Sequence, residues 1–379
     1  MNKLTHIELS RYSRHLALKD FGEKAQQKLK EAKVLVIGAG GLGCPALLYL
    51  SAAGVGKIGI ADFDVVQESN LQRQILFTTG DIGKPKADAA LVRLSQLNPL
   101  ISFTTHTYKI ESRNAIQIIS EYDIILDGSD NFPTRYLIND ACVLMDKPLI
   151  YGSILQYEGQ LAVFNAPLKN GERTVNYRDL FPQPPMPDEI PDCEQAGVLG
   201  VLPGVIGSMM AGEAIKLITG IGDLLAGMLV IFDSLSFQFT QIKIPDRKSR
   251  HSIIGLIDYE LFCGINQNKN KSLNMKEITV QELKQMLDNR DDFQLIDVRE
   301  PYENDLANLG GELIPMAEVP HQIHRISKTK KVVIHCRSGG RSGNIIKWLE
   351  KNHGFDNLYN LKGGILAWTK EIDPSLEVS

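Results

Sequence analysis

The stretch VLVIGAGGLGCP at residues 34–45 decides the expected fold. An apolar run of strand length leads into a glycine-rich turn and then into an apolar helix, and Gly38, Gly40 and Gly43 have the G-x-G-x-x-G spacing. Such a turn lets backbone N–H groups and a helix N-terminus face an anion. The stretch therefore predicts a strand–turn–helix unit that binds a nucleotide.

Short apolar strands alternate with helices after this stretch. KIGIAD, a helix over 84–97, ISFTTH and YDIILDGSD follow in order, and a helix over about 204–219 with strands LVIFDS and SFQFTQIKI closes the unit. This alternation predicts an α/β, Rossmann-like domain with a mainly parallel sheet. The proline-rich stretch 168–193, which precedes the helix over about 204–219, predicts a long exposed loop.

A change in composition predicts a second domain. Residues 263–276 are rich in Asn and Lys, as is typical of an interdomain linker. FQLIDVRE, VVIHCRSGGRSG and NLYNLKGG then predict a smaller α/β unit. We expect the nucleotide-binding domain over 1–262 and the second domain over 277–379.

The composition excludes several classes of protein. A formal net charge of −4 offers no basic field to nucleic acid. The uncharged stretches 34–56 and 195–212 are interrupted by Pro45, Pro203 and several glycines, so neither is expected to span a membrane. Five irregularly spaced cysteines argue against a disulfide framework. We expect a cytoplasmic protein.

The carboxylate of Asp62 leaves two nucleotides open. It ends the next strand, 19 residues after Gly43, where it could accept hydrogen bonds from ribose hydroxyls. On these features alone an NAD-dependent dehydrogenase is favoured. The following residues favour ATP, because Arg73 and Lys86 suit its roughly four negative charges, with Asp130 as a Mg²⁺ ligand.

Four motifs together resemble one family. GAGGLG, ADFDxVxxSNLxRQ, GKxK and DxxDNFxxR are similar to the MoeB/ThiF/HesA family, bacterial relatives of the ubiquitin-activating enzymes, over roughly residues 5–245. The resemblance implies adenylation of the C-terminal Gly carboxylate of a small ubiquitin-like carrier protein. It also implies a homodimer in which Arg14 is donated across the interface. The implied ATP site consists of Gly41, Asp62, Ser69, Asn70, Leu71, Gln72, Arg73, Lys86, Asp130 and Asn131.

Each of these charged residues also has a purely structural interpretation. Arg14, Arg73 and Lys86 could be solvated surface charges, and Asp130 could cap the helix that follows it. Arg14 is the weakest of these assignments, because arginines are common on helix faces.

The structural zinc of many family members is not expected here. Their first CxxC pair aligns with Asn176 and Asp179, and the second falls near RHSIIG, which has no cysteine. His251 and one carboxylate cannot supply four zinc ligands. We therefore expect this part of the domain to be held by packing alone.

Cys336 is the candidate sulfur-handling residue. It follows the strand KVVIH and opens CRSGGRSG, a turn whose N–H groups, with Arg337 and Arg341, favour an anionic sulfur. With DVREP before it and GGILAW after it, the region resembles a single rhodanese domain over about 277–375. Four residues separate Cys336 from Arg341, whereas the tyrosine-phosphatase pattern has five. GELIPMA replaces the usual GHIPGA, so the segment 303–318 is expected to differ in shape.

The two resemblances together imply one reaction sequence. Sulfur from a Cys336 persulfide would convert the adenylated carrier to a thiocarboxylate, with a sulfur donor such as a cysteine desulfurase reloading Cys336. The carrier could be MoaD-like, for molybdopterin synthesis, or ThiS-like, for thiamine synthesis. The alternative of another class is a dehydrogenase with a non-catalytic rhodanese docking module. Cys193, in IPDCEQAGVLG, is either a second catalytic cysteine that captures the activated carrier or a small buried residue.

Overall fold

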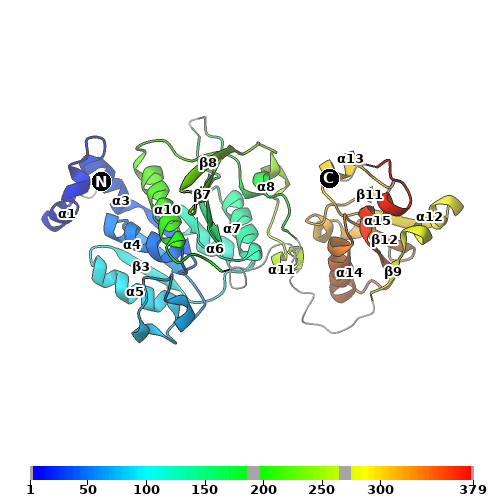
Figure 1. Cartoon of the computed structure of the whole chain (residues 1–379), viewed down its shortest axis with the longest axis horizontal. Helices are drawn as coiled ribbons and strands as arrows, with labels where there is room; N and C mark the ends of the chain where they lie inside the picture. The colour runs from blue at the N-terminus through cyan, green and yellow to red at the C-terminus, as the bar shows by residue number, and fades with distance from the viewer. Residues whose placement is uncertain (1–2, 169, 186–196, 264–274, 377–379) are drawn as a thin grey trace. The chain divides into compact units, whose positions relative to one another are not determined.

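The expected strand–turn–helix unit is present in the computed structural model as β1 (Lys33–Ile37), a glycine turn and α4 (Gly43–Ala53) (Figure 1). The structure describes residues 3–168, 170–185, 197–263 and 275–376. It divides into two compact units, and the smaller one takes in the chain from Ile257 onward. Each unit contains its own sheet and its own hydrophobic core.

The larger unit is built on an eight-stranded sheet of order β3-β2-β1-β4-β5-β6-β7-β8. The first five strands pair in parallel, whereas β5 to β8 pair antiparallel. The expected mainly parallel sheet is therefore confirmed, with an antiparallel half added beyond β5. The strands are β2 (Lys57–Ala61), β3 (Ser102–His106), β4 (Ile124–Asp127), β5 (Leu149–Leu155), β6 (Glu158–Phe164), β7 (Met228–Asp233) and β8 (Gln238–Lys243).

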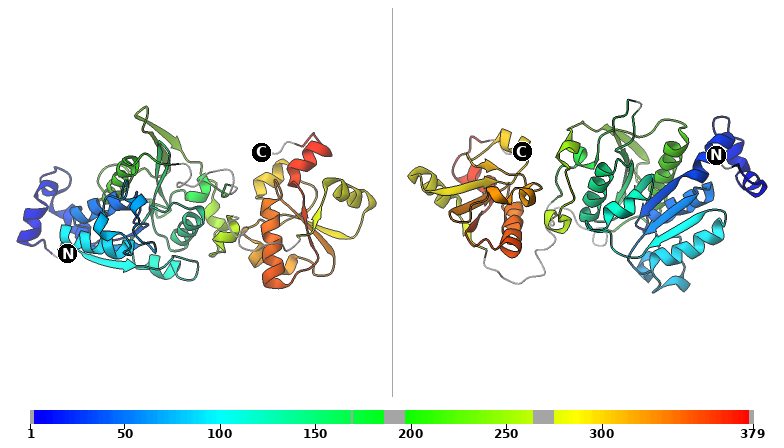
Figure 2. Two further views of the ribbon diagram at one scale, coloured as in Figure 1. Left: turned by 60° about the horizontal axis from the view of Figure 1, so that its bottom comes forward. Right: turned by 180° about the vertical axis from the view of Figure 1, so that it is seen from behind.

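Helices cover both faces of this sheet (Figures 1 and 2). One group packs together through α4 and α10 and comprises α3 (Gly22–Glu31), α4, α5 (Lys86–Leu97) and α10 (Leu202–Thr219). The other group comprises α6 (Ala115–Ser120), α7 (Phe132–Leu144) and α8 (Tyr177–Leu180). Short helices α1 (His6–Arg11) and α2 (Ser13–Leu16) precede α3. Single turns of 3-10 helix lie at η1 (Glu68–Asn70), η2 (Thr79–Asp81) and η3 (Ser249–Ser252).

The prediction of one long exposed loop after residue 167 is wrong for its central part. The chain forms α8 there, and Tyr177 is buried in a cluster of aromatic rings with Tyr136 and Tyr151. The guanidinium of Arg178 makes a two-point ion pair with buried Asp140, at 2.8 and 2.7 Å. These long-range contacts stabilise α8, although the prolines near it in the sequence predict a loop. Cys193 lies outside the described residues.

The smaller unit is a five-stranded parallel sheet of order β11-β10-β12-β13-β9. Its strands are β9 (Glu277–Ile278), β10 (Phe293–Asp297), β11 (Glu312–Leu313), β12 (Lys331–His335) and β13 (Leu358–Leu361). Its helices are α11 (Tyr259–Phe262), α12 (Val280–Asn289), α13 (Pro301–Leu306), α14 (Gly340–His353) and α15 (Gly364–Glu371). Single 3-10 turns lie at η5 (Val319–His321) and η6 (Ile323–Arg325). Among the described helices of both units, none has the length and apolar character needed to cross a membrane.

Candidate functional sites

The glycine-rich turn between β1 and α4 is shaped by close backbone contacts. Gly38 has φ of +88°, in the left-handed region that favours glycine. A Cβ at Gly43 would lie 1.8 Å from the carbonyl oxygen of Gly38, so no larger residue fits where the helix begins. The turn therefore brings the N-terminus of α4 against the end of β1, as the glycine spacing predicts.

A pocket opens at the carboxyl ends of β1, β2 and β4. Its empty volume is about 960 Å³, counting the open mouth. Because β2 and β4 lie on opposite sides of β1, the pocket occupies the switch point where open α/β sheets bind ligands. The predicted site residues that line it are Gly41, Asp62, Arg73, Lys86, Asp130 and Asn131.

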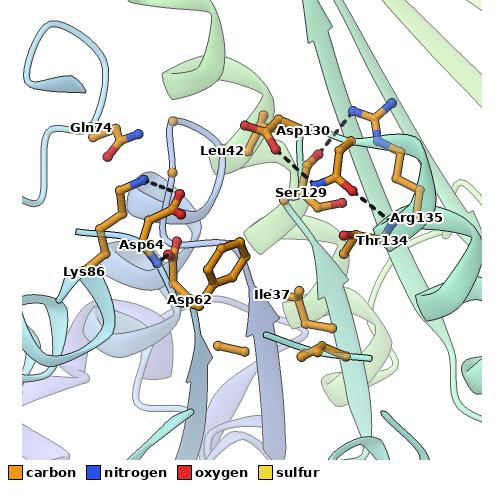
Figure 3. Close-up of a pocket in the computed structure, with 18 of the residues that line it drawn as sticks. Ile37, Leu42, Asp62, Asp64, Gln74, Lys86, Ser129, Asp130, Thr134 and Arg135 are labelled. Carbon is orange, nitrogen blue, oxygen red and sulfur yellow. Dashed lines mark hydrogen bonds and ion pairs between the residues drawn. The ribbon is translucent and has the colours of Figure 1, made fainter. Parts of the chain in front are cut away.

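Asp62 and Lys86 lie together on one side of the pocket (Figure 3). Asp62 accepts hydrogen bonds from the backbone N–H groups of Ala39, at 2.7 Å, and Asp64, at 2.9 Å. Burial raises the pKa of Asp62, and the positive charge of Lys86 opposes that rise. Lys86 Nζ is 3.0 Å from an oxygen of Asp64, so a bound polyphosphate would compete with Asp64 for this lysine.

Asp130 and Asn131 lie on the opposite side of the pocket. The cap of α7 is Asn131, whose Oδ1 accepts a 3.0 Å hydrogen bond from the N–H of Thr134. The alternative in which Asp130 caps this helix is therefore wrong, and its exposed carboxylate, which accepts one long bond from Asn131, remains able to bind a ligand. One carboxylate together with substrate phosphates is the usual environment of Mg²⁺.

Other predicted residues lie away from the pocket lining. Ser69, Asn70, Leu71 and Gln72 form the turn before Arg73, and the carbonyl of Ser69 accepts a 3.1 Å hydrogen bond from the Arg73 guanidinium. Arg14 lies on α2 with an exposed side chain and does not line the pocket. The donation of Arg14 across a dimer interface stays a prediction.

The sequence interpretation gave no role to two further residues of the pocket, Gln74 and Arg135. Gln74 is buried, and its Oε1 has no hydrogen-bond partner among the described residues, so a ligand in the pocket could supply one. Arg135 is buried on α7, donates to the carbonyl of Ser129 at 3.2 Å and opposes the burial-driven rise in the pKa of Asp127. Both residues could have been recognised from the sequence, because Gln74 ends the motif SNLxRQ and Arg135 ends the motif DxxDNFxxR.

The residues that replace the zinc ligands are joined by hydrogen bonds. Asp179 accepts from the N–H groups of Arg247 and Ser249, both at 3.1 Å, and Asn176 donates to the hydroxyl of Ser249 at 2.8 Å. The expectation that packing alone holds this region is therefore wrong. Across the described parts of the chain, no group of three or more His, Cys, Asp or Glu side chains forms a candidate metal site.

Cys336 follows β12 and lies under the turn that leads into α14. Only 1% of the residue is exposed. Its sulfur accepts a hydrogen bond from the N–H of Gly339 at 3.2 Å and lies 3.4 Å from the hydroxyl of Ser342. The first N–H groups of α15 donate to the carbonyls of Cys336, at 2.9 Å, and Arg337, at 3.0 Å, which explains why GGILAW accompanies the turn.

Charged side chains surround this turn. Arg341 forms a two-point ion pair with Glu303, with both distances at 2.8 Å. Desolvation alone would lower the pKa of Arg341, but the hydrogen bonds to Glu303 and the negative charges of Cys336, Glu303 and Glu300 together raise that pKa. The sequence interpretation assigned Arg341 to the sulfur but missed Glu303, which comes four residues after Arg299 in DVREPYE.

A buried polar cluster lies beneath Cys336. The guanidinium of Arg299 contacts both oxygens of Asp297, and both residues are 1% exposed. Neither ring nitrogen of buried His335 has a hydrogen-bond partner among the described residues, and burial lowers its pKa to about 4. The ring is therefore neutral near pH 7.

Comparison with known proteins defines the class of this chain. The ThiF family model matches residues 12–253, and the rhodanese-like domain model matches residues 279–371. The chain belongs to the ThiF family and carries a C-terminal rhodanese-like domain. It is an adenylyltransferase and sulfurtransferase, which decides against the dehydrogenase alternative.

Two named relatives align with nearly the whole chain, and a third aligns with about two thirds of it. The probable adenylyltransferase/sulfurtransferase MoeZ of Mycobacterium tuberculosis is 45% identical, over 98% of this chain and 96% of its own. The adenylyltransferase and sulfurtransferase MOCS3 of Drosophila ananassae is 40% identical, over 99% of this chain and 86% of its own. The sulfur carrier protein adenylyltransferase of Thermus thermophilus is 49% identical over 69% of this chain and 98% of its own.

Solved structures support the fold of the larger unit. The crystal structure of E. coli MccB with ATP has a TM-score of 0.53 and 24% identity, covering 62% of this chain and 71% of that chain. The structure of PaaA has a TM-score of 0.55 and 21% identity, covering 64% and 76%.

Proposed function

We propose that this chain adenylates the C-terminal glycine carboxylate of a small ubiquitin-like sulfur-carrier protein and then delivers sulfur to it from a Cys336 persulfide. The observation that carries the proposal is the presence, in one chain, of a switch-point pocket lined by cationic and acidic side chains and of a cysteine whose sulfur accepts a hydrogen bond from a backbone N–H of the turn above it. The name of the Thermus relative supports a sulfur-carrier protein as the substrate.

In the first step a carrier carboxylate oxygen attacks the α-phosphorus of ATP, forming an acyl-adenylate and releasing pyrophosphate. Asp62 orients the ribose, while Arg73 and Lys86 compensate the charge that develops on the phosphates. A magnesium ion held by Asp130 would supply further charge compensation there. The N–H groups after β1 face the phosphates at the start of α4.

In the second step the outer sulfur of a Cys336 persulfide attacks the acyl carbon and displaces AMP, which leaves an acyl disulfide. A persulfide places this sulfur about 2 Å beyond the buried Sγ, which explains how a cysteine that is only 1% exposed can react. A thiol then attacks Cys336 Sγ and releases the thiocarboxylate, and a dithiol reductant resets the resulting disulfide. We propose Cys193 as that thiol, and we propose also that it can capture the activated carrier first, displacing AMP to form a thioester from which the persulfide then displaces Cys193.

The proposed partners are a carrier protein, a sulfur donor and a second copy of this chain. A MoaD-like carrier is the first candidate and a ThiS-like carrier the alternative, and a cysteine desulfurase is the proposed sulfur donor. A homodimer would allow Arg14 of one subunit to reach the other subunit's pocket. The described cysteines are buried free thiols, and thiol chemistry of this kind suits the reducing cytoplasm.

The test is ATP–pyrophosphate exchange with MoaD-like and ThiS-like carriers offered separately. Exchange should require a carrier, and Asp130→Asn should lower it at least about 100-fold, because the carboxylate that would hold Mg²⁺ is lost. Asp223→Ala, which changes an exposed carboxylate outside the pocket, is the matched control. Near-normal exchange in Asp130→Asn would refute the site assignment.

The sulfur half is tested separately. Cys336→Ala should keep carrier-dependent exchange and lose thiosulfate:cyanide sulfur transfer, whereas Cys142→Ala, which removes a thiol buried in the larger unit, should keep both. Sulfur transfer that survives Cys336→Ala would overturn the persulfide assignment.

A further inference from the structure

A hydroxyl with one hydrogen lies among three acceptors beside Cys336. The Oγ of Ser342 is 2.6 Å from Oδ1 of Asn360, 3.2 Å from the carbonyl oxygen of Gly339 and 3.4 Å from Sγ of Cys336. Ser342 is fully buried and Asn360 is 3% exposed. Because a serine hydroxyl donates only one hydrogen bond, Ser342 cannot serve Asn360 and the sulfur at the same time.

The distances show which acceptor has the hydrogen in this arrangement. The contact to Asn360 is the short one, so the hydroxyl donates to the asparagine and the sulfur has the N–H of Gly339 as its clear donor. A sulfur that gains negative charge becomes the stronger acceptor, because hydrogen bonds to ionised groups are stronger than neutral ones. The hydroxyl hydrogen is then drawn toward Sγ.

Asn360 can support both arrangements. Its side chain carries an acceptor oxygen and a donor nitrogen on one planar amide, and a half-turn of that amide exchanges the two. After the half-turn the nitrogen donates to Ser342, whose hydrogen is free for the sulfur. Glycine at 339 and 343 leaves room for this, since a Cβ at either position would contact the amide nitrogen, at 3.5 and 3.6 Å.

We propose that Ser342 and Asn360 form a hydrogen-bond switch that stabilises negative charge on the Sγ of Cys336. Ser342 contacts the reacting sulfur directly, and Asn360 is a positioning residue that acts through Ser342. The proposal rests on the proposed role of Cys336 and adds the device that adjusts the site to the charge of its sulfur.

The charged groups around the turn are the same in Ser342→Ala, Ser342→Thr and Asn360→Ala, whereas Asn360→Asp adds a carboxylate to them. They are Arg337, Arg341 with Glu303 from α13, and the pair Asp297 and Arg299 with His335 from below. Differences among the wild type and the three variants that add no charge therefore report the switch itself.

The experiment measures the rate at which iodoacetamide alkylates Cys336 in the full chain as a function of pH, with the Cys336 peptide quantified by mass spectrometry. Ser342→Ala removes the donor, and Asn360→Asp gives Ser342 an acceptor that it cannot release. Each should raise the pH midpoint of alkylation by about one unit, a tenfold loss of thiolate below the midpoint. Ser342→Thr, which keeps the hydroxyl, and Asn360→Ala, which removes the competing acceptor, should not raise it.

The switch predicts that the alkylation midpoint rises in Asn360→Asp and does not rise in Asn360→Ala. A merely structural role for Asn360 would instead change the midpoint in the same direction in both variants. A midpoint in Ser342→Ala within about 0.3 unit of the wild-type value would overturn the proposal. So would a rise in Asn360→Ala equal to that in Asn360→Asp, a comparison that stands even where Ser342→Ala fails to fold. Alkylation needs no ATP, carrier or sulfur donor, so failure here is distinguishable from failure of the proposed function.

Discussion

Replacing Asp179 with alanine should destabilise the larger unit, because this carboxylate joins two distant segments. It is 2% exposed and accepts hydrogen bonds from Asn176, at 2.8 and 2.9 Å, and from the N–H groups of Arg247 and Ser249, at 3.1 Å. A hydrogen bond to a charged group contributes about 1.5–3 kcal/mol. The bonds within the α8 turn are local, so the two bonds between the segments dominate, and we expect a loss of about 3 kcal/mol.

The assay uses the placement of the tryptophans. Trp348 and Trp368 are the two tryptophans of the chain, and both lie in the smaller unit. In urea, Asp179→Ala should shift the circular-dichroism transition of the larger unit while the tryptophan fluorescence transition stays in place. Asp246→Ala, an exposed carboxylate that accepts only from Lys248 among the described contacts, is the matched control and should cost less than 1 kcal/mol.

The same preparation tests the metal prediction. Protein purified without chelator should contain well below one zinc atom per chain, and added zinc should not restore Asp179→Ala. A loss below about 1 kcal/mol in Asp179→Ala, or stoichiometric zinc in the larger unit, would refute the account of this region.

Three further outcomes are expected. The pKa of His335 is lowered to about 4 in the folded state, so its contribution to stability is complete above pH 6.5 and is lost as the pH falls toward 4. The loss should amount to about 3 kcal/mol at pH 4, and His335→Asn should remove this pH dependence of the free energy of unfolding, measured in urea by tryptophan fluorescence. Lys86→Gln should lower pyrophosphate exchange about 100-fold or more, whereas Asp64→Asn should cost less than about tenfold; equal losses would contradict the assignment of Lys86 to the phosphates. Cys193→Ser should keep exchange and thiosulfate:cyanide transfer but slow thiocarboxylate formation, and three unchanged rates would make Cys193 a packing residue.

The local parts of both sites could be predicted from the sequence. The glycine turn, the strand-end carboxylate Asp62 and the Cys336 turn depend on residues close together in the chain, so their spacing determines their geometry. Contacts between distant segments could not be read in this way. The pairing of Lys86 with Asp64 and of Arg341 with Glu303 depends on how strands and helices pack.

The α8 turn was missed for a related reason. The short helix α8 is flanked by a proline-rich segment, and its stability comes from Arg178 bound to Asp140 and from Tyr177 packed among other rings. Neither contact leaves a periodic pattern in the local sequence.

The central claim, that one chain activates a carrier with ATP and supplies it with sulfur from Cys336, is tested most directly by a single turnover. Radiolabelled sulfur is loaded on Cys336 as the persulfide, carrier protein is added with or without MgATP, and the carrier is analysed by mass spectrometry and for label. The account predicts label at the carrier C-terminus, with one oxygen exchanged for sulfur, only when MgATP is present. Label that stays on Cys336 when MgATP is present, or that reaches the carrier equally without ATP, would contradict it.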